Sequence, residues 1–199
     1  MFWAFSSRAL PAARVHPLPA ILAQWNDRSG DYFDQVKKTA PDYLIWSRFP
    51  VKVYVQPADA RSQNWVNLMM QAIEEWKQYF PLELVDRQTE ADISIDRSSI
   101  PLRFPPTERV RFADTRFELF EQNGILRHRM TIRIQPNRPD LSLLAAARHE
   151  IGHALGIWGH SPLESDVMFF SQVRTPPKIS VRDVNTLKRV YEQPTELGW

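Results

Sequence analysis

Apolar and polar residues follow regular periods over most of the chain after residue 50. The segment VKVYVQ (51–56) places β-branched or aromatic residues at alternate positions, which is typical of a half-buried strand. Over residues 64–80 the large apolar side chains recur every three or four positions and share one face of a helix, which Pro81 ends. This predicted apolar face consists of Trp65, Leu68, Met69, Ala72, Ile73, Trp76 and Phe80.

Four further strands are expected after this helix. LELVD (82–86) and ADISI (91–95) are short strand-like runs, and residues 109–120 and 125–136 alternate over longer stretches. The two longer runs are separated by Gln-Asn-Gly, and an Asn-Gly pair readily adopts the positive φ angles of a tight turn. The pattern therefore predicts a hairpin.

The segment DLSLLAAARHEIGHALG (140–156) is rich in strong helix formers. Asp140 or Ser142 is expected to cap its first turn, because a side-chain oxygen at the cap position accepts a backbone N–H. Gly156 is expected to end the helix, since glycine leaves helical geometry at little steric cost.

A last helix is predicted over residues 180–194, where Ser180 and Asp183 match a capping box. The order strand, helix, strands, helix, irregular segment, helix indicates a single α+β domain with a twisted, mixed sheet backed by helices. We expect this domain to span residues 49–199. Residues 1–48 show no sustained period and are interpreted as an N-terminal extension, either a pro-segment or an arm that packs on the domain.

Composition narrows the classes of protein that fit. Hydrophobic residues make up 43% of the 199 positions and charged residues 24%, which is enough apolar surface for a buried core. The net charge of +2 comes without runs of Lys and Arg interleaved with aromatic residues, so no nucleic-acid partner is expected. The absence of cysteine excludes disulfides, thiolate metal sites and a cysteine nucleophile.

Two histidines on the predicted helix are spaced to share a metal ion. Residues four apart lie nearly above one another on a helix, so His149 and His153 can present both imidazoles to one point. Glu150 follows the first histidine and can reach the same metal's surroundings without being a ligand. Zinc lowers the pKa of its bound water, and a nearby carboxylate can take that proton and deliver it to a leaving amine. The spacing thus provides the parts needed for peptide-bond hydrolysis.

The segment HEIGHALGIWGH, followed by SDVM, resembles the signature of the metzincin clan of zinc endopeptidases. In that clan HExxHxxGxxH precedes a methionine-bearing turn, and the chain is most similar to the matrixin-like, or matrix-metalloprotease-like, branch. The similarity covers about residues 51–194 and includes VKVYVQ, EEWKQYF, ADISI, FADTRF and SVRDVNTLKRVYEQP in the branch's order. The resemblance implies a metzincin-like catalytic domain that acts on protein or peptide substrates, and we expect a monomer.

By this resemblance, His149, His153 and His160 hold one catalytic Zn²⁺. Glu150 is then the general base that activates the zinc-bound water. Met168 lies in the Met-turn and forms an apolar floor beneath the metal without being a ligand.

The chain departs from the signature just before the third histidine. The signature has two residues between the glycine and that histidine, whereas this chain has Ile157, Trp158 and Gly159. A short loop can absorb the added contour of about 3.3–3.6 Å as a bulge, and Gly159 is the residue best able to adopt a positive φ. The third ligand is expected to be His160; the alternatives are Asp166 or a site with only two protein ligands.

A polypeptide substrate is expected to lie extended along the edge strand near Arg111–Phe117, paired through main-chain hydrogen bonds. Residues after the Met-turn are expected to line its pocket. The candidate substrate-binding residues are Arg111, Phe112, Ala113, Asp114, Phe169 and Phe170. His128 lies in a predicted strand and is expected at the surface rather than in the site.

A rival interpretation is a catalytically inactive, metzincin-like module that binds zinc or a partner, because the lengthened connection before His160 could distort the site. Glu150 argues against it, since an inactive descendant has no need of that carboxylate. The family resemblance favours secretion or the cell envelope, but the first 25 residues lack the continuous apolar core of a signal peptide. No run of apolar residues approaches the roughly 18 that a transmembrane helix needs.

Overall fold

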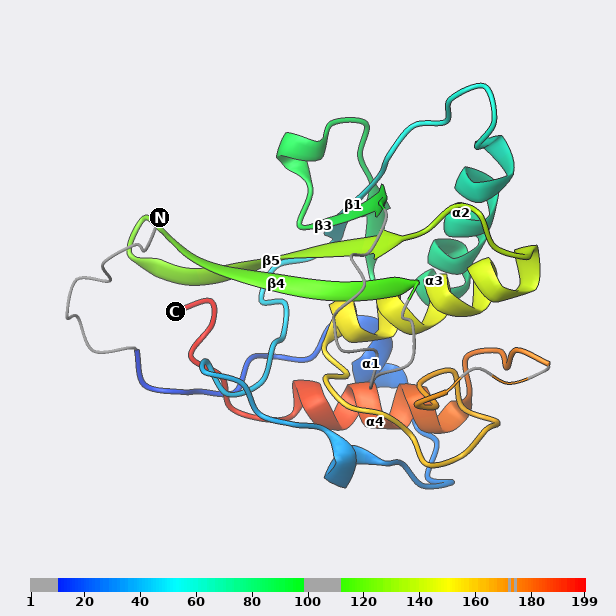
Figure 1. Cartoon of the computed structure of the whole chain (residues 1–199). Helices are drawn as coiled ribbons and strands as arrows, with labels where there is room; N and C mark the ends of the chain where they lie inside the picture. Colours follow the sequence, from blue (N-terminus) through cyan, green and yellow to red (C-terminus); the bar gives the residue numbers. More distant parts are fainter. Residues whose placement is uncertain (1–10, 99–111, 172, 174) are drawn as a thin grey trace, which may run out of the picture.

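The computed structural model describes residues 11–98, 112–171, 173 and 175–199. Its centre is a five-stranded sheet in the order β2-β1-β3-β5-β4. Figure 1 shows the long strands β4 and β5 beside β3 and β1. The first four strands in this order are parallel and β4 pairs with β5 in antiparallel, so the sheet is mixed. The strands are β1 (Val51–Val55), β2 (Leu82–Leu84), β3 (Ile93–Arg97), β4 (Ala113–Gln122) and β5 (Ile125–Ile134).

Helices pack on one side of this sheet. α3 contacts α2, β4 and β5, and α4 lies on the far side of α3 from the sheet (Figure 1). The predicted α+β fold with a mixed sheet is confirmed. The helices are α1 (Ala20–Gln24), α2 (Gln63–Lys77), α3 (Asp140–Leu155) and α4 (Val181–Tyr191), with short 3-10 turns η1 (Phe33–Gln35) and η2 (Gln88–Glu90). In the described part of the chain, no helix has the length and apolar composition needed to cross a membrane.

β4 and β5 form the predicted hairpin. The two residues between them, Asn123 and Gly124, have φ angles of 54° and 76°. Both angles are positive, as the Asn-Gly pair predicts. Among the described residues β4 pairs with β5 alone, so β4 is an edge strand of the sheet.

Of the two predicted helix caps, the one at α4 is present and the one at α3 is not. At α4 the capping box is present: the Ser180 side chain accepts the backbone N–H of Asp183, and the Asp183 side chain accepts the backbone N–H of Ser180. At α3 the prediction of a cap by Asp140 or Ser142 is wrong, because Pro139 occupies the cap position and no side chain caps the helix. Asp140 lies instead in the first turn, where its negative charge is favourable to the helix dipole.

The prediction that His128 lies at the surface is also wrong. It sits on β5 in phase with the buried Leu126 and Met130, and only 5% of it is exposed. Trp46 stacks on its ring with 3.9 Å between centroids. Burial lowers the pKa of His128 to about 3, so the ring is a neutral part of the core.

The described N-terminal residues contribute to the same core as the sheet. Leu22, Tyr32 and Leu44 are buried among the side chains of the sheet and the helices. The boundary at residue 49 stays a prediction, but part of the N-terminal extension packs against the predicted domain.

An ion pair between the buried Arg148 and the half-buried Glu75 joins α2 to α3. Arg148, which is 6% exposed, donates to both carboxylate oxygens of Glu75 at 2.5 and 2.7 Å. It also donates to the carbonyl of Pro177 at 3.1 Å. Burial alone would raise the pKa of Glu75, but the hydrogen bonds from Arg148 and Gln71 and the charges of Arg148 and Lys178 together hold the pKa below its ordinary value. The pair fixes α3 at the residue directly before His149.

We expect Glu75→Gln to lower the free energy of unfolding by about 3 kcal/mol at neutral pH, because Arg148 then lacks its counter-charge. Since the folded state lowers the pKa of Glu75, this stabilisation is fully present above the ordinary pKa of 4.5. It is lost as the pH falls through the lowered value. Urea unfolding over a series of decreasing pH values should therefore find a shrinking difference between wild type and variant.

Glu74→Gln is the matched control, because Glu74 forms an ion pair with Lys77 on the exposed face of the same helix. Exposed pairs contribute about 0–1 kcal/mol, so this variant should unfold almost like the wild type. Equal losses in the two variants would contradict a special role for the pair of Arg148 and Glu75.

Candidate metal centre and active-site cleft

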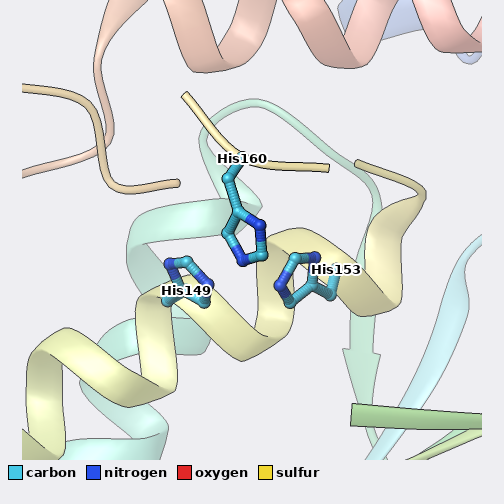
Figure 2. A group of neighbouring side chains, drawn as sticks. All are labelled: His149, His153 and His160. Carbon is cyan, nitrogen blue, oxygen red and sulfur yellow. The ribbon is translucent and has the colours of Figure 1, made fainter. Parts of the chain in front are cut away.

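Three imidazole rings converge at the C-terminal half of α3. His149 and His153 lie one turn apart on the helix, and His160 comes back from the segment beyond it and points toward the space between them (Figure 2). The ring centroids are 4.7 Å apart for the helical pair, and His160 lies 5.2 Å from His149 and 5.0 Å from His153. One ligand atom from each ring lies within 4.8 Å of the other two, so the three rings could hold one ion.

Backbone carbonyls orient two of the rings. Nδ1 of His149 lies 2.9 Å from the carbonyl oxygen of Val167, and Nδ1 of His153 lies 2.7 Å from that of Ile157. Because a carbonyl oxygen only accepts, each Nδ1 carries the proton, and the lone pair of the neutral ring is on Nε2. This is the tautomer in which Nε2 binds a metal, and the second hydrogen bond fixes the ring's direction.

The chain returns from α3 to His160 through two positions that need glycine. Gly156 has a φ of 125°, and a Cβ there would lie 2.7 Å from the carbonyl oxygen of Leu44. The positive φ expected at Gly159 is not found, so that prediction is wrong. Glycine is needed at this position for space, since a Cβ would lie 2.2 Å from the carbonyl oxygen of Gln35.

Asp166, the alternative third ligand, makes other bonds. It is fully buried, and its carboxylate accepts hydrogen bonds from Ser180 at 2.8 Å, from Arg182 at 3.1 Å and from Ser161. These bonds connect the loop after His160 to the start of α4. Within the described residues, the side chains grouped closely enough for a metal are the three histidines, without Asp166.

Glu150 borders the cleft beside the histidines and is 8% exposed. The hydroxyl of Thr115, on β4, lies 2.6 Å from Oε2 of this carboxylate and donates to it. Sequence reasoning missed Thr115. Its signal is the alternation along β4, which puts Thr115 on the same strand face as Ala113 and Phe117.

Met168 packs against α3 at Gly152. It is fully buried, and a Cβ on Gly152 would lie 2.3 Å from its sulfur. The thioether thus fills the space that glycine leaves on the helix, next to His153 in the sequence. This packing is compatible with the apolar floor expected for Met168.

A cleft of about 1050 Å³ opens over these residues. One wall is the beginning of β4, and the segments on either side of Met168 form much of the rest. Arg111 lies outside the described residues. The five other substrate-binding candidates line the cleft: Phe112, Ala113, Asp114, Phe169 and Phe170.

Asp114 supplies a negative charge to the β4 wall. Arg133 of β5 donates to both of its carboxylate oxygens, at 2.8 and 2.5 Å. Burial alone would raise the pKa of Asp114, but the bonds from Arg133 and Arg116 hold it below its ordinary value. The wall therefore presents an ionised carboxylate whose charge is largely balanced within the sheet.

Comparison with known proteins identifies the family. The Matrixin family model matches residues 46–192, which is well over half of the chain. No curated protein matches it. The chain belongs to the matrixin family, as the resemblance in its sequence indicates.

The matrixin family implies zinc, and the donor set fits that metal. Neutral imidazole nitrogen is a common zinc ligand, and a catalytic site combines three protein ligands with one open position. The carbonyls of Val167 and Ile157 already hold His149 and His153 in the tautomer that this requires.

We expect His160→Ala to lower zinc affinity by more than the roughly 10–100-fold that follows loss of an outer hydrogen-bond partner. Asp166→Asn should retain zinc although it weakens a buried network and so lowers thermal stability. Competition with a chromogenic chelator measures both affinities. Unchanged metal content in dialysed His160→Ala, or zinc loss in folded Asp166→Asn, would contradict the assignment of His160.

Proposed function

We propose that this matrixin is a zinc-dependent endopeptidase that hydrolyses peptide bonds in protein substrates. The observation that carries the proposal is the convergence of three imidazoles in a cleft that a buried glutamate also borders. The cleft runs beside an edge strand, which suits an extended polypeptide better than a small molecule.

In this proposal the three histidines bind the metal and Glu150 moves the proton. A bound zinc would act as a Lewis acid on the scissile carbonyl and lower the pKa of a coordinated water. Glu150 takes a proton from the attacking water and delivers it to the leaving amine. Thr115 donates to Oε2 and so holds the carboxylate in one orientation.

The substrate backbone is proposed to pair with the outer edge of β4 near Ala113–Phe117. An unpaired edge presents N–H and C=O groups to an added strand. The candidates on the β4 wall then contact the substrate's backbone, and Phe169 and Phe170 contact its side chains. Phe170 is 63% exposed at the cleft, so it is available for such a contact.

Glu150→Gln should retain zinc and lose nearly all cleavage, because the amide has the same shape but cannot accept the proton. The measurement is hydrolysis of an unfolded protein such as casein, together with metal content. The chelator-treated wild type should also be inactive and should recover when zinc is added. A wild type that holds zinc but cleaves nothing would support the inactive, zinc-binding module instead.

Thr115→Val should reduce kcat about tenfold, the equivalent of one hydrogen bond of roughly 1.4 kcal/mol. KM should change little, because the hydroxyl contacts Glu150 and not the substrate. Thr115→Ser is the matched control: it keeps the hydroxyl and should keep kcat close to wild type. Similar kcat values for the valine and serine variants would contradict the orienting role of Thr115.

A further inference from the structure

Residues Tyr32–Lys37 precede the region that the Matrixin family model matches, yet they lie next to the metal centre. We infer that this stretch, the support segment, positions two of the three proposed zinc ligands and belongs to the active form of the protein. Tyr32 and the backbone N–H of Lys37 are its positioning groups. The inference rests on the proposed zinc site and adds to it a part of the chain that the family signature does not contain.

The first connection runs from Tyr32 to His149. The Tyr32 hydroxyl donates to Oδ1 of Asp183 at 2.5 Å, and the backbone N–H of Val167 donates to Oδ2 of the same carboxylate at 2.9 Å. The carbonyl of Val167 is the group that accepts Nδ1–H of His149. The carbonyl and the N–H of Val167 thus connect His149 to the Asp183 carboxylate, which also accepts the Tyr32 hydroxyl.

Burial makes this connection strong. Tyr32 is 4% exposed and Asp183 is fully buried, so water cannot replace the hydroxyl when it is removed. A buried carboxylate needs all of its donors, and loss of one forces it to shift toward those that remain. The Val167 N–H is one of these, so the shift is passed to the carbonyl beside His149.

The second connection runs from the end of the support segment to His160. Val36 and Gly159 form an antiparallel bridge, and the Lys37 N–H donates to the carbonyl of Trp158 at 3.0 Å. Gly159 directly precedes His160, and any side chain there would collide with the backbone of Gln35. The lengthened connection before the third histidine therefore has a partner in the support segment.

The support segment is fixed to α4 through Tyr32 and through Gly30 and Asp31, the two residues before it. The Tyr32 N–H donates to the hydroxyl of Thr186 at 3.0 Å, and Asn185 donates to the carbonyl of Gly30 at 2.8 Å. Asp31 accepts from Arg189 at 2.8 and 2.9 Å. These bonds place the segment independently of the histidines, which is what allows it to position them.

A merely structural role would make the same contacts, so the test must separate ligand positioning from stability. Tyr32→Phe keeps the buried ring and removes the hydroxyl that reaches Asp183. We expect the zinc dissociation constant of the 199-residue chain to rise about tenfold, in the range found for outer partners of metal ligands. Affinity is measured by chelator competition well below the unfolding temperature of each variant.

Tyr191→Phe is the matched control. Its hydroxyl is also buried, donates to the carbonyl of Leu155 and accepts the N–H of Trp46, but it has no bond to Asp183. It should lower thermal stability and leave zinc affinity at the wild-type value. Tyr32→Phe with wild-type zinc affinity, or an equal loss of affinity in both variants, overturns the positioning role.

Lys37→Pro tests the second connection by removing the N–H that Trp158 accepts. Val36 has φ −81° and ψ 126°, a conformation favoured before proline, so the residue preceding the substitution needs no rearrangement. Zinc affinity should again fall about tenfold, whereas Lys37→Ala keeps the N–H and should bind zinc as the wild type does. Equal affinities in these two variants overturn this half of the inference.

Measurements on the wild type distinguish failure of the proposed zinc site from failure of the positioning role of the support segment. A wild type that binds no zinc overturns the proposed function and, with it, the role of the support segment. A wild type that binds zinc as tightly as Tyr32→Phe and Lys37→Pro overturns the support segment alone.

Discussion

The arrangement of the proposed metal centre depends on two hydrogen bonds from ring nitrogens to backbone carbonyls. The helical spacing brings His149 and His153 to one side of α3, but it does not decide their tautomer or the direction of their rings. The carbonyls of Ile157 and Val167 decide both. Because these carbonyls lie outside the helix, the chain must return over α3 twice, once directly after Gly156 and again at the Met-turn. His149 and His153 are therefore oriented only when residues 156–168 have folded over α3.

Two buried carboxylates hold that return in place. Asp166 and Asp183 are both fully buried, and each accepts several hydrogen bonds from the loop and from the start of α4. An unpaired carboxylate at such a depth would cost several kcal/mol, so the loop is stable only in a conformation that supplies every donor. This requirement selects one loop geometry more sharply than apolar packing would, since apolar contacts tolerate small shifts. Apolar contact contributes at one point, where Met168 fills the space above Gly152.

Short-range patterns predicted the elements well, and contacts between distant residues limited the rest. Asn123-Gly124 and the Ser180–Asp183 capping box depend on neighbours in sequence, and both formed as expected. The grouping of His149, His153 and His160 followed from helical spacing and the family signature. The surface placement of His128 failed because the covering residue, Trp46, is far away in the chain. The reason for Gly159 lies in the backbone of Gln35, which no local pattern reveals. Alternation along β4 gives the strand face of Thr115 but not its contact with Glu150, which belongs to another element.

Gly159 also bears on how the N-terminal extension relates to the catalytic machinery. The backbone next to His160, a proposed metal ligand, carries groups that need partners, since an unpaired buried N–H or C=O is costly. In this chain Gly159 pairs with Val36, and the Trp158 carbonyl accepts the N–H of Lys37; both partners lie before the part that matches the family. The backbone before His160 and residues 36–37 of the N-terminal part therefore satisfy each other's hydrogen-bonding groups. Loss of this pairing is therefore expected to release the backbone directly before His160.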